Sequence, residues 1–385
     1  MTIHVFSLIM TSAAWLLVAF TLWPLARLMM PARRQKKLAE PSAPSAPDVT
    51  VIVLTDSNHE GLINVIAALK SQDYPGKTNI IITCDPTSRL LSETVKQILH
   101  NNPDIYATYV PEETRNVSRR KLAIYLGVKG SKTDRVVLVT SDTKIMSNRW
   151  LLTVMDCFDD RTDIVVSPVR PVAFPGKGFR KGLRVLDFVL TNLTWLSAAL
   201  AGKCFRGDSH NLAYRQKSFF DNKGFSKSLN FHYGDDDIFI NEISKRGRVG
   251  VNLFPDGLCE TVALDSFVYE RMSRHRLFTT RGLGAGARRL TSSLSLVGWA
   301  ILACIALGVI FAQGNLLFLI LAPMSIVGYC VLTGLGLSRA ARFLRIPVPA
   351  ATVGPALLMR PFLTLRRLLK LRKEKDINYS WKKLK

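Results

Sequence analysis

Arg135-Val-Val-Leu-Val-Thr-Ser-Asp-Thr143 carries the strongest structural signal in this sequence. Its apolar residues follow one another without alternation, which is typical of a parallel strand covered on both faces. The stretch ends near a carboxylate, Asp142, and open α/β sheets bind their ligands beyond the carboxyl ends of the strands. Asp also often caps a helix, and residues 145–158 have helical spacing, so a capping role for Asp142 is the alternative interpretation.

The same alternation of strand and helix precedes this stretch. We expect strands at 49–54, 79–83 and 105–110 and helices at 58–72, 88–100 and 118–129. Strands that alternate with helices at this spacing predict an α/β fold with a parallel sheet and right-handed crossovers. The sequence therefore predicts a Rossmann-like nucleotide-binding domain.

Three segments are apolar and uncharged over about the 20 residues that span a bilayer: 5–25, 294–311 and 316–337. No small-residue cleavage site separates the first from the basic cluster behind it, which indicates an uncleaved anchor. The other two are only four residues apart and are predicted to form a transmembrane hairpin. Basic residues flank all three at 33–37, 281–289 and 339–345, so the positive-inside rule predicts a cytosolic central segment.

The chain is strongly basic, with 52 Lys and Arg against 29 Asp and Glu and a net charge of +23. The end of the chain, with Arg366-Arg-Leu-Leu-Lys-Leu-Arg-Lys373, predicts interfacial amphipathic helices whose cations meet anionic lipid. A nucleic-acid patch is the alternative, but the aromatic residues typical of single-strand binding are missing there. The six cysteines form no C-x-x-C pair, which indicates reduced thiols of a cytosolic domain.

Two groups of charged residues are candidates for ligand binding. Asp85 and Asp142 follow predicted strands, and Arg119-Arg-Lys121 opens the helix before the second of them. Carboxylates near cations suit a nucleotide diphosphate and a divalent metal, although a solvated helix face would also explain the cations.

Three adjacent acids, Asp235, Asp236 and Asp237, follow Gly234 at the start of a helix predicted to run to about Lys245. Acids in the first turn of a helix are stabilised by its dipole, which is a purely structural explanation. Adjacent like charges also repel, and in a partly buried site this raises the pKa of one of them, as a general base requires.

Taken in order, these motifs resemble the membrane-anchored family 2 glycosyltransferases, whose catalytic domain has the GT-A fold and whose broad group includes cellulose, hyaluronan and dolichyl-phosphate sugar synthases. The resemblance covers residues 49–276. Asp85 stands where the family has Asp-Asp-Gly-Ser, and Lys121 matches Lys-x-x-Ala. Thr140-Ser-Asp142 stands at Asp-x-Asp. The remaining matches are 207–215 with Gly-x-x-x-Asn-x-Ala-Tyr-Arg, 234–237 with the Glu-Asp-x-Asp region, and 271–275 with Gln-x-x-Arg-Trp.

Two departures from the family pattern matter. Thr140 replaces the first Asp of Asp-x-Asp, which leaves Asp142 and the substrate phosphates to hold Mg²⁺ or Mn²⁺. Arg-x-x-Arg-His replaces Gln-x-x-Arg-Trp, so the indole that grips a growing chain in processive synthases is absent. With three predicted spans, this indicates a non-processive enzyme.

The resemblance implies inverting transfer of a sugar from a nucleotide diphosphate sugar to a membrane-proximal glycan acceptor, in polysaccharide or lipid-linked glycan synthesis. Asp85 would hold the base of the nucleotide, and Asp142 a divalent metal. Depending on how the motif is aligned, Asp235 or Asp236 is the catalytic base. Arg120 and Lys121 would contact the diphosphate, and Arg274 and His275 would close over donor phosphates or acceptor.

The acceptor is expected to be lipid-linked, with a soluble glycan or a protein as alternatives. An inactive nucleotide-sugar-binding scaffold of a glycan-assembly complex, or an unrelated membrane-anchored binding protein, would also account for the departures. The expected organisation is an N-terminal transmembrane helix (1–30), a Pro-rich linker (31–48), a cytosolic GT-A domain (49–280), a transmembrane hairpin (292–337) and a basic interfacial tail (338–385). We expect a bacterial inner membrane location.

Overall fold

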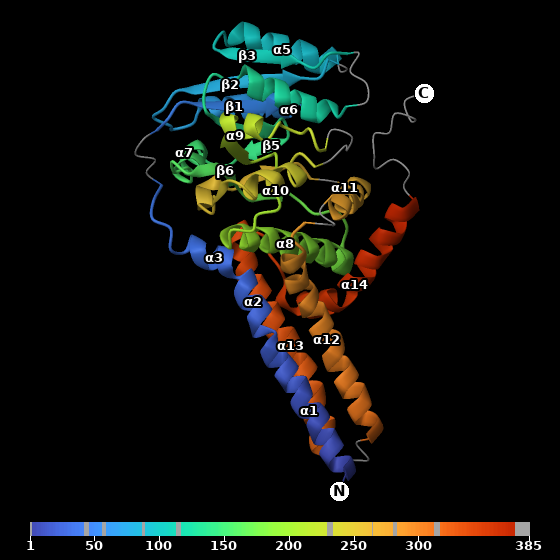
Figure 1. Cartoon of the computed structure of the whole chain (residues 1–385). Coiled ribbons are helices and arrows are strands. Elements are labelled where there is room, and N and C mark those ends of the chain that lie inside the picture. The colour runs from blue at the N-terminus through green and yellow to red at the C-terminus, as the bar shows by residue number, and fades with distance from the viewer. Residues whose placement is uncertain are drawn as a thin grey trace. The chain divides into compact units, whose positions relative to one another are not determined.

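The computed structural model describes residues 2–373 except 42–45, 56–58, 87–88, 113–116, 229–233, 264, 280–282 and 312–315. The chain forms two compact units (Figure 1). The sheet unit comprises Lys37–Ala173, Ala198–Gly284 and Leu371–Lys385, and the helical unit comprises Met1–Lys36, Phe174–Ser197 and Ala285–Lys370.

A mixed sheet forms the centre of the sheet unit, with the strand order β3-β2-β1-β4-β8-β6-β9. The four predicted strands are parallel: β1 (Val49–Leu54) lies between β2 (Thr78–Cys84) and β4 (Arg135–Thr140), and β3 (Ile105–Tyr109) lies outside β2. β8 (Leu212–Arg215) runs antiparallel to both its neighbours, β4 and β6 (Thr162–Val166), and β9 (Arg248–Val251) pairs with β6. The predicted α/β class is confirmed, with one reversed strand inside the sheet.

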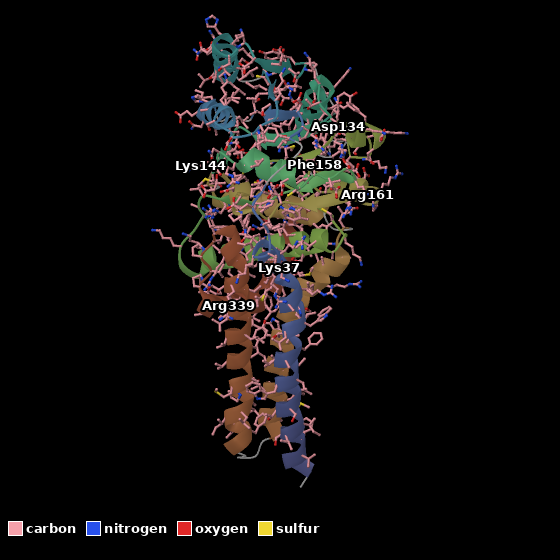
Figure 2. The ribbon with its side chains drawn as sticks, turned by 90° about the vertical axis from the view of Figure 1, so that its left-hand side faces the viewer. Lys37, Asp134, Lys144, Phe158, Arg161 and Arg339 are labelled. Atoms are coloured by element: carbon pink, nitrogen blue, oxygen red, sulfur yellow. The ribbon has the colours of Figure 1, made fainter. Side chains whose placement is uncertain are left out.

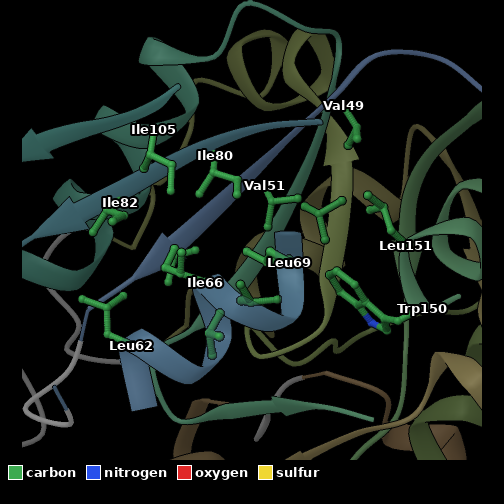
Figure 3. Packing of buried hydrophobic residues seen from close by; sticks show 14 of the residues in the cluster. Val49, Val51, Leu62, Ile66, Leu69, Ile80, Ile82, Ile105, Trp150 and Leu151 are labelled. Atoms are coloured by element: carbon green, nitrogen blue, oxygen red, sulfur yellow. The ribbon is translucent and has the colours of Figure 1, made fainter. Parts of the chain in front are cut away.

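Helices cover the parallel part of this sheet: α4 (His59–Lys70), α5 (Arg89–Asn101), α6 (Arg119–Gly130) and α7 (Trp150–Asp156). Leu62, Ile66 and Leu69 share one face of α4 and are buried against the valines and isoleucines of β1 and β2 (Figure 3). On α6, Gly127 allows close packing, since a Cβ there would lie 2.7 Å from Ile52 Cγ2. The core therefore holds α4 and α6 against the strands that carry the strand-end acids.

The expected helix over residues 145–158 is wrong in its first part. β4 ends at Thr140, and residues Thr143–Ile145 form a second strand, β5, before α7 begins at Trp150. β5 pairs antiparallel with β10 (Cys259–Thr261), which also pairs with β7 (Val169–Pro171). Buried Glu260 on β10 pairs with Arg170 and with Lys144, which is labelled in Figure 2. Asp142 therefore precedes a strand and does not cap a helix.

An aromatic cluster supports the segment that carries the three adjacent acids. Phe219 of α9 (Gln216–Asp221) stacks on Tyr214 at 5.6 Å and packs against Phe239 at 5.2 Å. Phe239 belongs to α10 (Ile238–Ser244), which directly follows the acids. The 3₁₀ helix η1 (Pro255–Gly257) and α11 (Ser266–Thr279) complete this unit.

The helical unit contains α1 (Thr2–Phe20), α2 (Leu22–Leu28), α3 (Met30–Gln35), most of α8 (Gly178–Leu200), α12 (Ala285–Phe311), α13 (Leu316–Ala341), η2 (Arg342–Leu344) and most of α14 (Ala350–Lys373). Figure 1 shows α1, α12 and α13 side by side, and Tyr329 of α13 donates a hydrogen bond to the Leu294 carbonyl of α12 at 2.7 Å. Among the described residues, four helical segments are long and apolar enough to cross a membrane: Val5–Leu28, Gly178–Leu200, Ala285–Ile310 and Phe318–Leu344. The sequence interpretation identified the first, third and fourth of them, and the segment in α8 is additional.

One acid of α8 is held by two cations of α14. Asp187 Oδ2 lies 2.6 Å from Arg367 Nη1, and Asp187 Oδ1 lies 3.4 Å from Arg360 Nε. The side chains of Asp187 and Arg367 are only 15% and 11% exposed. A carboxylate on an apolar helix is therefore fully paired within the helical unit.

Candidate active site

The candidate site lies where the direction of strand addition reverses. From β1 the chain adds β2 and β3 on one side and then returns to place β4 on the other side of β1. Ligands of open α/β sheets bind at such a switch point. Asp85 follows β2 and Asp142 follows β4, so one strand separates them and the strand axes are about 10 Å apart. Both predicted carboxylates thus belong to the edge where a ligand is expected.

Asp142 is an ionised carboxylate. Its Oδ1 accepts a hydrogen bond from the Thr140 hydroxyl and lies 3.3 Å from His210 Nε2. Burial by itself would raise the pKa of Asp142, but the charge and hydrogen bond of His210, together with Thr140, lower it to about 2. Asp142 is therefore negatively charged throughout the physiological pH range.

His210 lies between two acids. Its Nδ1 is 2.5 Å from Asp208 Oδ1, and its Nε2 faces Asp142. Burial alone would lower the pKa of His210, but the charges of Asp208 and Asp142 raise it to about 10. Both ring nitrogens are consequently donors at neutral pH, and His210 is an imidazolium that links Asp142 to the segment before β8.

The first of the three adjacent acids is a buried ion-pair partner. Asp235 Oδ2 lies 2.9 Å from Arg120 Nε and 3.0 Å from the Ser209 hydroxyl. Burial would raise the pKa of Asp235, but the Arg120 guanidinium outweighs it, and the pKa is lowered. Asp237 caps α10, since its Oδ1 accepts a hydrogen bond from the Ile238 N–H at 2.6 Å. Asp235 and Asp237 thus have structural partners.

Asp236 is different from both neighbours. It is partly exposed, and within the described part of the chain its carboxyl group makes no hydrogen bond. Burial first, and then the charges of Asp235 and Asp237, raise the pKa of Asp236 from 3.8 to about 7. Its backbone is held, because its carbonyl accepts a hydrogen bond from the Gly207 N–H at 2.6 Å. A carboxyl that titrates near neutral pH and has no partner can act as a general base.

The predicted cations occupy three different environments. Arg119 binds Asp85 with two hydrogen bonds of 2.7 Å, Nε to Oδ2 and Nη2 to Oδ1. Arg120 is partly exposed and interacts with Asp235, Asp236 and Asp142. Lys121 is only 1% exposed.

The buried ammonium of Lys121 donates to the Ser228 carbonyl and lies 5.9 Å from the centre of the Phe225 ring. Burial lowers the pKa of Lys121 to about 8, although nearby acids oppose the shift. Arg274 is 7% exposed on α11, and the side chain of His275 lies outside the described residues. The structure therefore joins Arg120, Asp142, Asp235 and Asp236, and puts Lys121 beneath the surface.

The sequence interpretation missed several charged residues of this site. They lie just before β8 or on α11: Arg206, Asp208, His210 and Arg276. Arg276 Nη2 is 3.6 Å from Asp208 Oδ2. Because β8 is antiparallel, the start of β8 lies at the same sheet edge as the ends of β1 and β4. The motif match at 207–215 included Asp208 and His210 but gave neither side chain a role. A further signal was the dense run of polar residues in Arg206-Gly-Asp-Ser-His-Asn211.

Around Asp142, the described residues could give a divalent metal one protein ligand, which is Asp142 itself. The described residues contain no group of three or more His, Cys, Asp or Glu side chains that could hold a metal ion. Asp142 offers Oδ2, which makes no hydrogen bond in the described part of the chain. Mg²⁺ keeps several waters and commonly takes one or two carboxylates together with substrate phosphates. This donor set therefore fits an ion that a bound diphosphate carries into the site.

Comparison with known proteins supports the fold. Among solved structures, the chain is similar to the mannosyltransferase PcManGT from Pyrobaculum calidifontis in complex with GDP-Man and Mn²⁺. The identity is 17%, the TM-score is 0.52, and the match covers 94% of this chain and 99% of that one. The chain has a glycosyltransferase-like fold.

A second match, to a mycobacterial protein described only as such, has 17% identity, covers 62% of this chain and 74% of that one, and has a TM-score of 0.39, which is too low to bear on the fold. No protein-family model and no curated protein matches the sequence.

Proposed function

We propose that the chain is an inverting glycosyltransferase that moves one sugar from a nucleotide diphosphate sugar to the hydroxyl group of an acceptor. The observation that carries this proposal is Asp236, a carboxyl with a pKa raised to about 7 and no hydrogen-bond partner among the described residues. It interacts with Arg120, which also interacts with Asp142 at the end of β4. A base, a cation and a strand-end carboxylate in one cluster suit a glycosyltransferase-like fold.

We assign the donor to the part of this cluster that lies at the ends of β2 and β4. Asp85, oriented by Arg119, would bind the base of the nucleotide, and Arg120 would bind the diphosphate. Asp142 would hold Mg²⁺ or Mn²⁺, which supplies positive charge to the departing diphosphate when bound. Lys121 was predicted to contact the diphosphate, and its buried hydrogen bond to the Ser228 carbonyl gives it a supporting role next to Arg120 in the sequence of α6.

In the proposed reaction the Asp236 carboxylate takes the proton of the acceptor hydroxyl. The acceptor oxygen forms a bond to the anomeric carbon while the bond to the nucleotide diphosphate breaks on the opposite face, so the configuration inverts. Asp235 keeps Arg120 in place through its 2.9 Å contact, and the lowered pKa of Asp235 makes it a poor base. Of the two candidates that the sequence left open, we therefore propose Asp236 as the base.

The acceptor is proposed to be lipid-linked and presented at the cytosolic face of a bacterial inner membrane. Four candidate membrane-spanning helices support membrane association. On α14, exposed Leu365 and Leu369 alternate with Arg366 and Lys370, which suits contact with anionic lipid. Addition of a single sugar is favoured because Arg-x-x-Arg-His lacks the indole of processive synthases.

Asp236→Asn tests the proposed base. We expect kcat to fall by about 10²- to 10⁴-fold, because general-base catalysis contributes that much, while affinity for the nucleoside diphosphate stays unchanged. Asp104→Asn is the matched control, since Asp104 is 69% exposed and pairs only loosely with Lys70. Full transfer activity in Asp236→Asn would overturn the assignment.

The second candidate function is an inactive nucleotide-sugar-binding scaffold, which Thr140 favours because it replaces an acid at a metal position. Two measurements on one protein preparation distinguish the transferase from the scaffold. Calorimetric titration of the wild-type protein with nucleoside diphosphates, with and without Mn²⁺, is followed by transfer assays using a membrane extract as acceptor. Binding without any turnover would establish the scaffold, and no binding would overturn both functions.

A further inference from the structure

Arg206 is a largely buried cation that has no partner among the described residues. It is 5% exposed, and within the described part of the chain its guanidinium makes no hydrogen bond and no ion pair. Buried arginines are normally paired, because a charge that loses contact with water is costly without compensation. Arg206 is therefore a candidate for binding an anion.

The surroundings of Arg206 increase this imbalance. Burial, and next the positive charge of Arg276, lower the pKa of Arg206 to about 10, and the charges of Asp236, Asp208 and Asp237 only partly oppose this effect. Asp208 already interacts with His210 and Arg276. Two guanidinium groups therefore repel each other beside one acid that is already engaged.

Arg206 and Arg120, the proposed donor-binding cation, both interact with the proposed base Asp236. Arg120 interacts with Asp235, Asp236 and Asp142, whereas Arg206 interacts with Arg276 and with Asp236, Asp208 and Asp237. An anion bound by Arg206 would thus be near Asp236.

We propose that Arg206 and Arg276 form an anion site for the acceptor, and that the acceptor carries a phosphate group close to the hydroxyl that Asp236 deprotonates. This proposal rests on the proposed function and adds the chemical class of the acceptor. Guanidinium groups bind phosphate with paired hydrogen bonds, and a phosphate would supply the partner that Arg206 lacks. The lipid-linked acceptor is accordingly a phospholipid whose headgroup carries the reacting hydroxyl.

A phosphate group could also come from the donor, so the experiment separates the two sources. Full-length protein in neutral detergent is titrated with inorganic phosphate, and the unfolding temperature is measured with and without a saturating nucleoside diphosphate, chosen as the one among GDP, UDP, ADP and CDP that stabilises the protein most. The variants are Arg206→Gln and, as a matched control, Arg89→Gln, whose side chain is 93% exposed.

We expect inorganic phosphate to raise the unfolding temperature of the wild type and of Arg89→Gln in a saturable way, with or without the nucleoside diphosphate. Arg206→Gln should lose the response to phosphate and keep the response to the nucleoside diphosphate. Its own unfolding temperature should equal or exceed that of the wild type, because an uncompensated buried charge is removed. In transfer assays the KM for the acceptor should rise at least tenfold, with the KM for the donor unchanged.

Three results would overturn the proposal. A phosphate response that the nucleoside diphosphate abolishes, together with weaker nucleotide binding by Arg206→Gln, would assign Arg206 to the donor diphosphate. No phosphate response in the wild type would exclude the anion site. A lower unfolding temperature of Arg206→Gln without ligand would make Arg206 a structural residue. The phosphate titration needs no turnover, so it is informative even if the protein transfers no sugar.

Discussion

Asp187 in the helical unit and Asp236 in the sheet unit are both partly buried acids, and their surroundings are opposite. Asp187 accepts from two arginines of α14, at 2.6 and 3.4 Å. Asp236 is flanked by two other acids and has no hydrogen-bond partner in the described part of the chain. The first arrangement stabilises a helix pair, whereas the second costs stability and leaves a carboxyl ready to take a proton.

The arginines repeat this contrast. Arg360 and Arg367 are paired with Asp187, while Arg206 is buried without a partner among the described residues. A buried charge that has its partner stabilises the fold. A buried charge without a partner is expected to contact a ligand or to take part in a reaction. Substitutions that change one charge at a time test this distinction.

The largest effect on stability is expected at the paired acid. Asp187→Asn leaves two largely buried arginines facing a neutral group, and breaking such a pair typically costs about 3–5 kcal/mol. Denaturant unfolding of the full chain in mixed micelles measures the loss. A change below about 1 kcal/mol would show that this ion pair stabilises the protein no more than an exposed pair does.

Asp236→Asn should stabilise the protein, and only at higher pH. Because folding raises the pKa of Asp236 from 3.8 to about 7, the folded state binds the proton more tightly, and wild-type stability falls as pH rises through this window. At about 1.4 kcal/mol per pKa unit the deficit reaches at most ~4 kcal/mol above pH 7. Unfolding of wild type and variant should coincide near pH 4 and diverge by pH 8. Parallel curves across this range would contradict the raised pKa.

The neighbouring substitution Asp235→Asn should have the opposite sign at pH 7. It removes the acceptor of a 2.9 Å hydrogen bond from Arg120, and a hydrogen bond to a charged group contributes about 1.5–3 kcal/mol. Because folding lowers the pKa of Asp235, this contribution is present above the unfolded pKa and is lost as pH falls. The same unfolding measurements apply. If both variants shift stability in one direction, the division of roles between the two acids is wrong.

The smallest effect is expected for an exposed pair. Arg89 and Glu93 are one helical turn apart on α5, 2.9 Å from each other, with side chains 93% and 53% exposed. Glu93→Gln should change the free energy of unfolding by no more than about 0.5 kcal/mol, and salt should weaken the wild-type contribution. This variant sets the baseline for the other three.

The strands and the strand-end acids could be predicted because parallel β1, β2 and β4 are continuous apolar runs and their ligand edge follows from topology. A family motif matched residues 207–215, but the contacts of the charged residues in 206–211 could not be predicted, because this segment precedes a strand and reaches the same edge only through the reversed direction of β8. Asp235 and Asp236 are indistinguishable in the sequence, since the position of the Arg120 side chain separates them. Lys121 looks like a surface residue at a helix start, and only the packing of Phe225 and Ser228 around it makes it buried.

The pairing of Asp187 with Arg360 also constrains how the protein is made. The two residues are 173 positions apart, so at about 5–20 residues per second the ribosome needs roughly 10–35 s to supply the cation after the acid. During that interval an apolar helix carries an unpaired carboxylate, which opposes its stable insertion into lipid. We expect α8 to reach its final position only after α14 has been synthesised, so truncation before residue 360 should leave α8 accessible to proteases or chaperones.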